Sequence, residues 1–162
     1  MLVPLLSRCA RTGSRMTPQD QEFLHLPEEG SIGDCLRACV ATVLDFEREY
    51  VPHFVVVGIR AGDKDREEDP GMKWWEALVK WLALHGLECW WIEDLELVEY
   101  SKLNHLLVSG KAERPNGIFQ HVCVAELDGH IVHDPNPARS KLITVDGYFL
   151  FTELGTWKSI SE

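Results

Sequence analysis

The segment from residue 118 to residue 134 constrains the fold of this chain more than any other. Its first half, IFQHVCVAEL, alternates so that His121 and Cys123 face one way while the residues between them face the other. Asp128-Gly129 follows, a dipeptide typical of tight hairpin turns, and HIVHD then returns. The pattern predicts two antiparallel strands side by side, with Asp134 ending the second strand.

Two helices are expected before this hairpin. CLRACVATVLDF has apolar residues at helical spacing after the N-cap candidate Asp34, and MKWWEALVKWLALH has a second apolar stripe. The expected helices span 35–46 and 72–85, the strands 87–93, 105–110, 118–127, 130–134 and 142–151, and the loops 51–54, 61–71 and 111–117. A break of the last strand at Asp146-Gly147 is an alternative. This order predicts an α+β fold, with N-terminal helices packed on a largely antiparallel sheet of four to five strands.

Composition limits the classes of function. The chain has 162 residues, of which 45 % are hydrophobic, and this suits one domain with a real core. We expect that domain over 16–162, after a loose extension over 1–15, with Met16 as an alternative start. The formal charge of −10 opposes binding to phosphate backbones, so no nucleic-acid partner is expected. No stretch approaches the roughly 18 apolar residues of a membrane span, so no membrane partner is expected either.

The five cysteines do not form the pattern of a disulfide framework or of a usual structural zinc site. Their number is odd, their spacing is irregular, and no C-x-x-C pair is present. The apolar run Leu2–Leu6 is also too short for a secretory leader. Free thiols suit a reducing compartment, and we expect a cytoplasmic protein.

Cys35, His121 and Asp134 together predict chemistry. Cys35 begins a helix, where unpaired N–H groups and the helix dipole favour a thiolate. A hairpin centred on Asp128-Gly129 places Asp134 near Cys123 and diagonal to His121, within reach if a bulge intervenes. Each residue alone has a structural explanation, but the trio matches a nucleophile, a base and the group that orients the base.

The motifs around these residues resemble those of known proteins. GDCLRACVA at 33–41, HVCVA at 121–125 and HDPNP at 133–137 resemble the papain-like cysteine peptidases, in particular the bacteriocin-processing double-glycine peptidases. GDCLRACVAT, VPHF, WLALHGL and IVHDPNPAR more closely resemble a group of small uncharacterised phage and bacterial papain-like proteins, over 17–145. The resemblance implies a papain-like fold.

The same resemblance implies roles for the trio. Cys35 would be the nucleophile, His121 the general base and acid, and Asp134 the orienting group. The peptidases keep a Gln shortly before the nucleophile to hold the oxyanion, but here Glu29 stands six positions upstream, and Leu36 replaces a Gly. Gln21, fourteen positions upstream, could serve only if a loop intervenes, and the backbone N–H of Cys35 is the other oxyanion candidate.

Other residues are expected at the rim of the site or in the core. The candidates for lining a cleft are Asp34, His105, His133 and Trp74. Cys39, one turn below Cys35, is expected to be buried packing. A zinc site of Cys35, His105, His121 and Asp134 is an alternative, but we expect no metal and no cofactor.

These observations predict a cysteine-nucleophile enzyme that transfers acyl groups, most simply by hydrolysing peptide or isopeptide bonds in a peptide or protein substrate. Transglutaminase-like transfer and cell-wall amidase activity use the same trio. A different class of function is a papain-like scaffold that binds a host factor, as a phage or bacterial protein would. The oligomeric state stays open.

Overall fold

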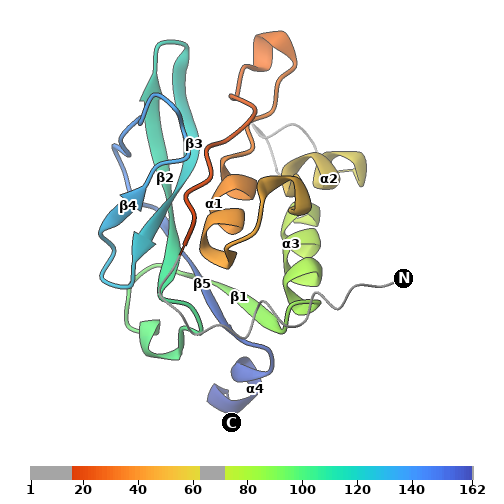
Figure 1. The fold of residues 1–162 in the computed structure, drawn as a ribbon, viewed down its shortest axis with the longest axis vertical. Coiled ribbons are helices and arrows are strands. Elements are labelled where there is room, and N and C mark those ends of the chain that lie inside the picture. Colours follow the sequence, from red (N-terminus) through yellow and green to blue (C-terminus); the bar gives the residue numbers. More distant parts are fainter. Residues whose placement is uncertain (1–15, 63–71, 162) are drawn as a thin grey trace.

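The structure, a computed structural model, describes residues 16–62 and 72–161. The expected extension over 1–15 and the acidic stretch over 63–69 lie outside the described residues. Five antiparallel strands form one sheet in the order β1-β5-β2-β3-β4, with helices beside it (Figure 1). The strands are β1 Leu87–Ile92, β2 His105–Arg114, β3 Gly117–Glu126, β4 Ile131–His133 and β5 Gly147–Glu153. The helices are α1 Cys35–Leu44, α2 Phe54–Arg60, α3 Lys73–Ala83 and α4 Thr156–Ile160. The α+β prediction is confirmed.

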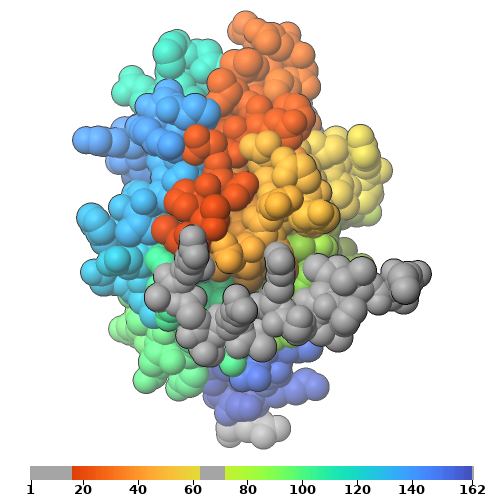
Figure 2. Space-filling view, viewed as in Figure 1, coloured from red at the N-terminus to blue at the C-terminus, as the bar shows by residue number. Residues whose placement is uncertain are grey.

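The main core lies between the sheet and the first three helices. α1 begins at Cys35, as predicted, and packs on β3, where its buried Val40 joins Val122 and Val124. α3 lies against β1 and buries Leu78 completely in the same cluster. Burying apolar faces from both layers is the main force that holds α1 on the strand carrying His121. Six of the ten residues of α1 are buried. In the space-filling view the red residues at the start of the described chain lie beside the orange segment that includes α1 (Figure 2).

Two local expectations were wrong. The segment after Pro52 is not only a loop, because α2 begins at Phe54, whose ring is buried edge-on against Trp81 of α3. Tertiary packing here overrides the low helix propensity of a Val-rich run. The segment 111–117 is not a long connection either, since β2 continues to Arg114 and pairs with β3 around a turn at Pro115-Asn116. β2 and β3 therefore stay paired beyond the residues that contribute to the apolar core.

The last strand begins later than predicted. β5 starts at Gly147, and upstream of it Leu142 forms only an isolated bridge with Ala112. The backbone of Thr144 passes so close to Gly110 that a Cβ atom there would lie 1.8 Å from the Thr144 carbonyl oxygen. Gly110 therefore permits this crossing next to the strand pair that carries His121.

The β3–β4 hairpin has the predicted form, including an irregularity. Val124 pairs with His133 and Ala125 with Ile131, so a bulge separates the two pairs. Continuing the first register places Asp134 level with Cys123, next to His121. None of the helices in the described ranges has the length and apolar character needed to cross a membrane.

Candidate active site

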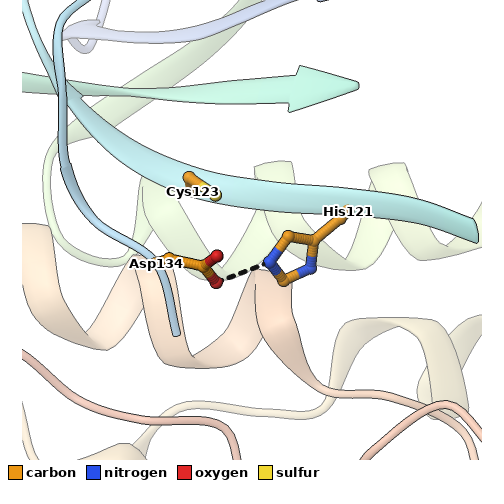
Figure 3. Close-up of side chains that lie close together, drawn as sticks. All are labelled: His121, Cys123 and Asp134. Atoms are coloured by element: carbon orange, nitrogen blue, oxygen red, sulfur yellow. Dashed lines mark hydrogen bonds and ion pairs between the residues drawn. The ribbon is translucent and has the colours of Figure 1, made fainter. Parts of the chain in front are cut away.

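His121 and Asp134 form the centre of the site. The His121 side chain is fully buried, and its Nε2 lies 2.7 Å from Asp134 Oδ1 (Figure 3). The same carboxylate oxygen accepts the backbone N–H of Asn136 at 2.8 Å, a turn typical of Asp followed by Pro and Asn. The carboxylate is thus fixed from two directions, and it holds one nitrogen of the imidazole.

Cys35 approaches the same imidazole from the N-terminus of α1. Its thiol is half-buried, unpaired by any disulfide, and hydrogen-bonded to His121. Burial lowers the pKa of His121, but hydrogen bonds with Asp134, Cys123 and Cys35, together with the negative charge of Cys35, raise it to about 11. These interactions favour an imidazolium, which in turn favours a thiolate at Cys35.

Cys123 is a second thiol at the imidazole. It is buried on the same face of β3 as His121, and its sulfur lies within 4.8 Å of a ring nitrogen of that residue. Burial raises the pKa of Cys123, although the bond to His121 opposes this effect. One ligand atom from each of His121, Cys123 and Asp134 lies within 4.8 Å of the other two (Figure 3). The alternation of this strand predicts Cys123 on the same face as His121, but no motif in the sequence indicates a role for it.

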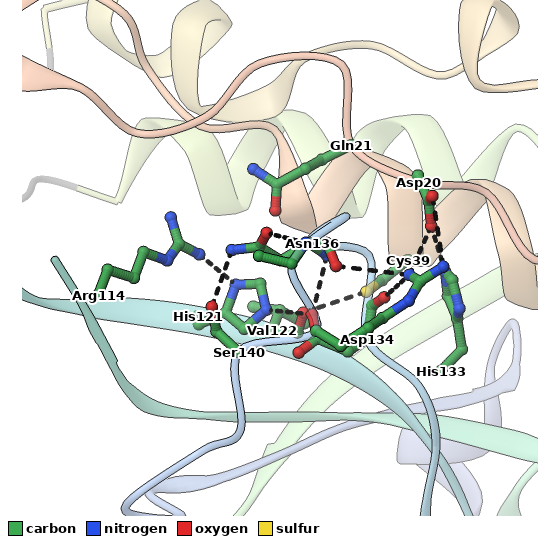
Figure 4. Close-up of polar contacts among 12 residues, drawn as sticks. Asp20, Gln21, Cys39, Arg114, His121, Val122, His133, Asp134, Asn136 and Ser140 are labelled. Atoms are coloured by element: carbon green, nitrogen blue, oxygen red, sulfur yellow. Dashed lines mark hydrogen bonds and ion pairs between the residues drawn. The ribbon is translucent and has the colours of Figure 1, made fainter.

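Arg114 was missed entirely. It ends β2, and its Nη2 lies 3.1 Å from Nδ1 of His121, the nitrogen that Asp134 does not hold (Figure 4). Within the described ranges, its Nε–H is buried without a hydrogen-bond acceptor. The sequence did not indicate a role for Arg114, because this residue lies in the segment 111–117, whose turn residues predicted a connecting loop.

Gln21 lies close to the site because a loop does intervene. The backbone N–H of Phe23 donates to Asp34 Oδ1 at 2.8 Å, and the N–H of Asp34 donates to the Phe23 carbonyl at 3.2 Å. Residues 24–33 therefore form a loop that is closed at its base by Phe23 and Asp34. This closure brings Gln21 close to Cys35 although the two residues are fourteen positions apart in the sequence. The backbone of Gln21 donates to the Pro135 carbonyl at 2.8 Å, beside Asp134.

The Gln21 side chain is buried and only partly satisfied. Its Nε2 donates to the Phe23 carbonyl at 2.6 Å, and its Oε1 has no partner among the described residues. Figure 4 shows this amide group directed toward Asn136 and His121. Glu29, by contrast, is exposed in the loop, so the position six residues upstream is not the spatial counterpart of the expected glutamine.

Two further contacts hold the segment before α1 against the end of β4. The Arg139 guanidinium donates to Asp20 Oδ1 at 2.7 Å and also to the Asp134 carbonyl. His133 Nε2 lies 2.8 Å from the Gln19 carbonyl. His133 is therefore a buried structural residue, and the prediction that it lines a cleft is wrong, since it points away from the face of Asp134.

Two other rim predictions are also wrong. Asp34 does not cap α1 with its side chain and faces no cleft, because its carboxylate is fully buried against Phe23 and Arg37. His105 pairs with Glu126, five residues along β2 from Gly110, the partner of His121. At about 3.3 Å per residue it lies roughly 16 Å from the site, which also removes the zinc set that included it.

The remaining candidates are core residues. The Trp74 ring contacts Trp75 and Phe149 in the main core, and its role at a cleft stays a prediction. Cys39 is fully buried, as predicted, and its Sγ lies 3.3 Å from the Val122 carbonyl. Burial raises the pKa of Cys39 well above its ordinary value, which leaves Cys35 as the accessible thiol of α1.

No family model, curated protein or solved structure matches the chain. The interpretation of the site therefore depends on its own geometry.

Proposed function

We propose that this protein is a cysteine-nucleophile acyl-transfer enzyme of papain-like fold that hydrolyses peptide or isopeptide bonds. One observation carries the proposal: a buried imidazole is held by Asp134 at 2.7 Å and is hydrogen-bonded to a thiol at the start of a helix. A nucleophile, a base and an orienting carboxylate in contact are the minimum set for this chemistry.

The proposed reaction has two steps. The Cys35 thiolate attacks the substrate carbonyl carbon, and His121 gives its proton to the departing amine, leaving a thioester on Cys35. The now neutral His121 then takes a proton from water, whose oxygen attacks the thioester and releases the acid and the Cys35 thiolate, which restores the thiolate and the imidazolium. Asp134 holds the imidazole in the required orientation throughout. An amine in place of water would give transfer instead of hydrolysis.

The developing oxyanion needs donors. The backbone N–H of Cys35 is one, because the first N–H groups of a helix have no intrahelical acceptor. Gln21 is the second candidate, since its buried amide lies next to the Asp134 segment and one of its two N–H groups remains after the bond to Phe23.

Alkylation of cysteines tests the proposal. Wild-type protein is treated with iodoacetamide at about pH 6, below the ordinary thiol pKa of about 8.5, and each cysteine is followed by mass spectrometry. Cys35 should react far faster than the buried Cys89, and His121→Ala should remove that advantage. Equal rates at Cys35 and Cys89 would refute the proposal. A peptide library incubated with wild type and with Cys35→Ala then identifies cleavage that depends on the thiol.

A second candidate function is a binding scaffold with a weak or silent site. The observation that favours it is Arg114, whose Nη2 lies 3.1 Å from Nδ1 of His121, because a positive guanidinium beside this nitrogen opposes the imidazolium that the proposed reaction needs. This function predicts that Cys35→Ala retains full biological effect. In either case the four described cysteines are free thiols, which suits a reducing compartment such as the cytoplasm.

A further inference from the structure

We infer that Cys35, His121, Cys123 and Asp134 form a zinc site. The bound metal would coordinate both the nucleophile and its base and would thereby inhibit the enzyme. The metal site itself does not depend on the proposed function, but the inhibition does. This set differs from the one considered from sequence, because Cys123 takes the place of the distant His105.

The geometry brings the donor atoms together before any metal arrives. One ligand atom from each of His121, Cys123 and Asp134 lies within 4.8 Å of the others, and Cys35, at the start of α1, interacts with the same imidazole from outside this group of three. In a tetrahedral zinc site with bonds of about 2.0–2.3 Å, neighbouring donor atoms lie roughly 3.3–3.8 Å apart. Closing the group of His121, Cys123 and Asp134 therefore requires side-chain shifts of about 1 Å. The Cys35 thiol must in addition turn toward the metal to become the fourth ligand.

The chemistry of the donors selects the metal. Thiolate sulfur and imidazole nitrogen prefer zinc to the oxygen-seeking Mg²⁺ and Ca²⁺, and zinc commonly takes four such ligands. The outer contacts of a metal site are also present. Asp134 is held by the N–H of Asn136, and Asn136 Nδ2 in turn donates to Ser140 Oγ at 3.1 Å (Figure 4). Such contacts orient ligands and strengthen metal binding.

Charge balance supports the same set. Two thiolates and one carboxylate carry −3, zinc carries +2, and the neighbouring Arg114 guanidinium carries +1, so the loaded site is neutral. A buried cluster without net charge avoids most of the cost of desolvation. When zinc binds Nε2 of His121, the proton of the neutral ring moves to Nδ1, and Arg114 must turn from that nitrogen toward the thiolates.

The consequence is a reversible block. Zinc would replace the proton between His121 and Asp134 and would bind the Cys35 thiolate, so neither attack nor proton transfer could occur. Binding would release protons from both thiols, and the block would therefore be stronger at higher pH.

Metal titration tests the inference directly. Full-length wild type, Cys123→Ser and the matched control Cys89→Ser are titrated with Co²⁺, whose thiolate charge-transfer absorption reports sulfur ligands, and then with Zn²⁺ in competition. Cys89 is also a buried thiol, on β1, and serves as the control for losing a core cysteine. Wild type and Cys89→Ser should bind both metals. Cys123→Ser should bind at least about 10- to 100-fold more weakly, the cost of losing even an outer partner of a ligand.

A second measurement needs no variant, in case Cys123→Ser does not fold. X-ray absorption at the zinc edge of the loaded wild type should show two sulfur neighbours at about 2.3 Å. One sulfur or none, or equal affinity in wild type and a folded Cys123→Ser, would overturn the zinc site.

The metal site and the proposed function fail in different ways. If cobalt binds with two thiolates while Cys35 is alkylated no faster than Cys89 in metal-free protein, the enzyme proposal fails and the metal site stands. If metal-free Cys35 is reactive and neither metal binds, the zinc inference fails and the enzyme proposal stands. Zinc that binds without slowing the alkylation of Cys35 would remove the inhibitory role.

Discussion

Replacing Asp134 is the most informative change that the structure offers. Its carboxylate accepts two hydrogen bonds, from His121 at 2.7 Å and from the N–H of Asn136 at 2.8 Å. Hydrogen bonds to charged groups contribute about 1.5–3 kcal/mol, and neutral ones about 0.5–1.5 kcal/mol. Asp134→Asn keeps neutral acceptors and should cost about 1–2 kcal/mol. Asp134→Ala removes one partner of a buried ion pair and should cost about 3–5 kcal/mol.

The loss should depend on pH in a defined direction. The pKa of His121 is raised from 6.5 to about 11 in the folded protein, so the folded state holds this proton more tightly than the unfolded state. The resulting stability is fully present below pH 6.5 and is lost as the pH rises toward 11, with a slope of up to about 1.4 kcal/mol per pH unit. Burial opposes the raised pKa, and the hydrogen bond with Asp134 is the largest of the causes that raise it, so the decline should be shallower without Asp134.

Thermal and urea unfolding at several pH values measure both effects. For a chain of this length, 1 kcal/mol shifts Tm by about 2–4 °C, so Asp134→Ala should lower Tm by about 6–20 °C near neutral pH. Asp146→Asn, which changes an exposed carboxylate bonded to Gln120, is the matched control and should cost less than about 1 kcal/mol. An Asp134→Ala protein with the wild-type Tm, or with an unchanged pH slope, would refute the reasoning about the ion pair.

Three further predictions concern the surroundings of the site. Gln21→Ala should lower turnover about 10²- to 10³-fold if its amide holds the oxyanion, as measured on any peptide cleaved by wild type, while Gln120→Ala should not change it. Arg114→Ala should speed the alkylation of Cys35, because it frees Nδ1 of His121. The expected factor is about fivefold, which corresponds to a hydrogen bond of about 1 kcal/mol. A slower reaction would show instead that Arg114 stabilises the thiolate. Gly110→Ala should cost about 3 kcal/mol or more in urea unfolding, since its Cβ would lie 1.8 Å from the Thr144 carbonyl oxygen, and a wild-type midpoint would contradict this contact.

Much of the site was predictable because it depends on local patterns. Asp128-Gly129 between two alternating runs predicts the hairpin, and the hairpin brings His121 and Asp134 together. Apolar spacing after Asp34 predicts where α1 begins, and so places Cys35 at the end of a helix.

The rest depends on contacts that no short stretch of sequence contains. The position of Gln21 follows from the closure of a loop by Phe23 and Asp34, eleven residues apart. Arg114 reaches His121 only because β2 continues beyond its apolar portion. α2 forms because Phe54 packs on Trp81, which is a tertiary contact. Each miss is a case in which pairing or packing over distance outweighed local propensity.

The strand order has a consequence for how the protein matures. β5, near the end of the chain, lies between β1 and β2, and it pairs with both of them. A growing chain can form α1 early and the β2–β3–β4 hairpins later, but the sheet stays divided until residues 147–153 emerge. The core cluster that α1 shares with Phe149 and Phe151 of β5 is therefore incomplete for most of synthesis. If the Cys35 thiol gains its reactivity from this packing, it would be unreactive on the growing chain. It would become reactive only when synthesis of the polypeptide is nearly complete.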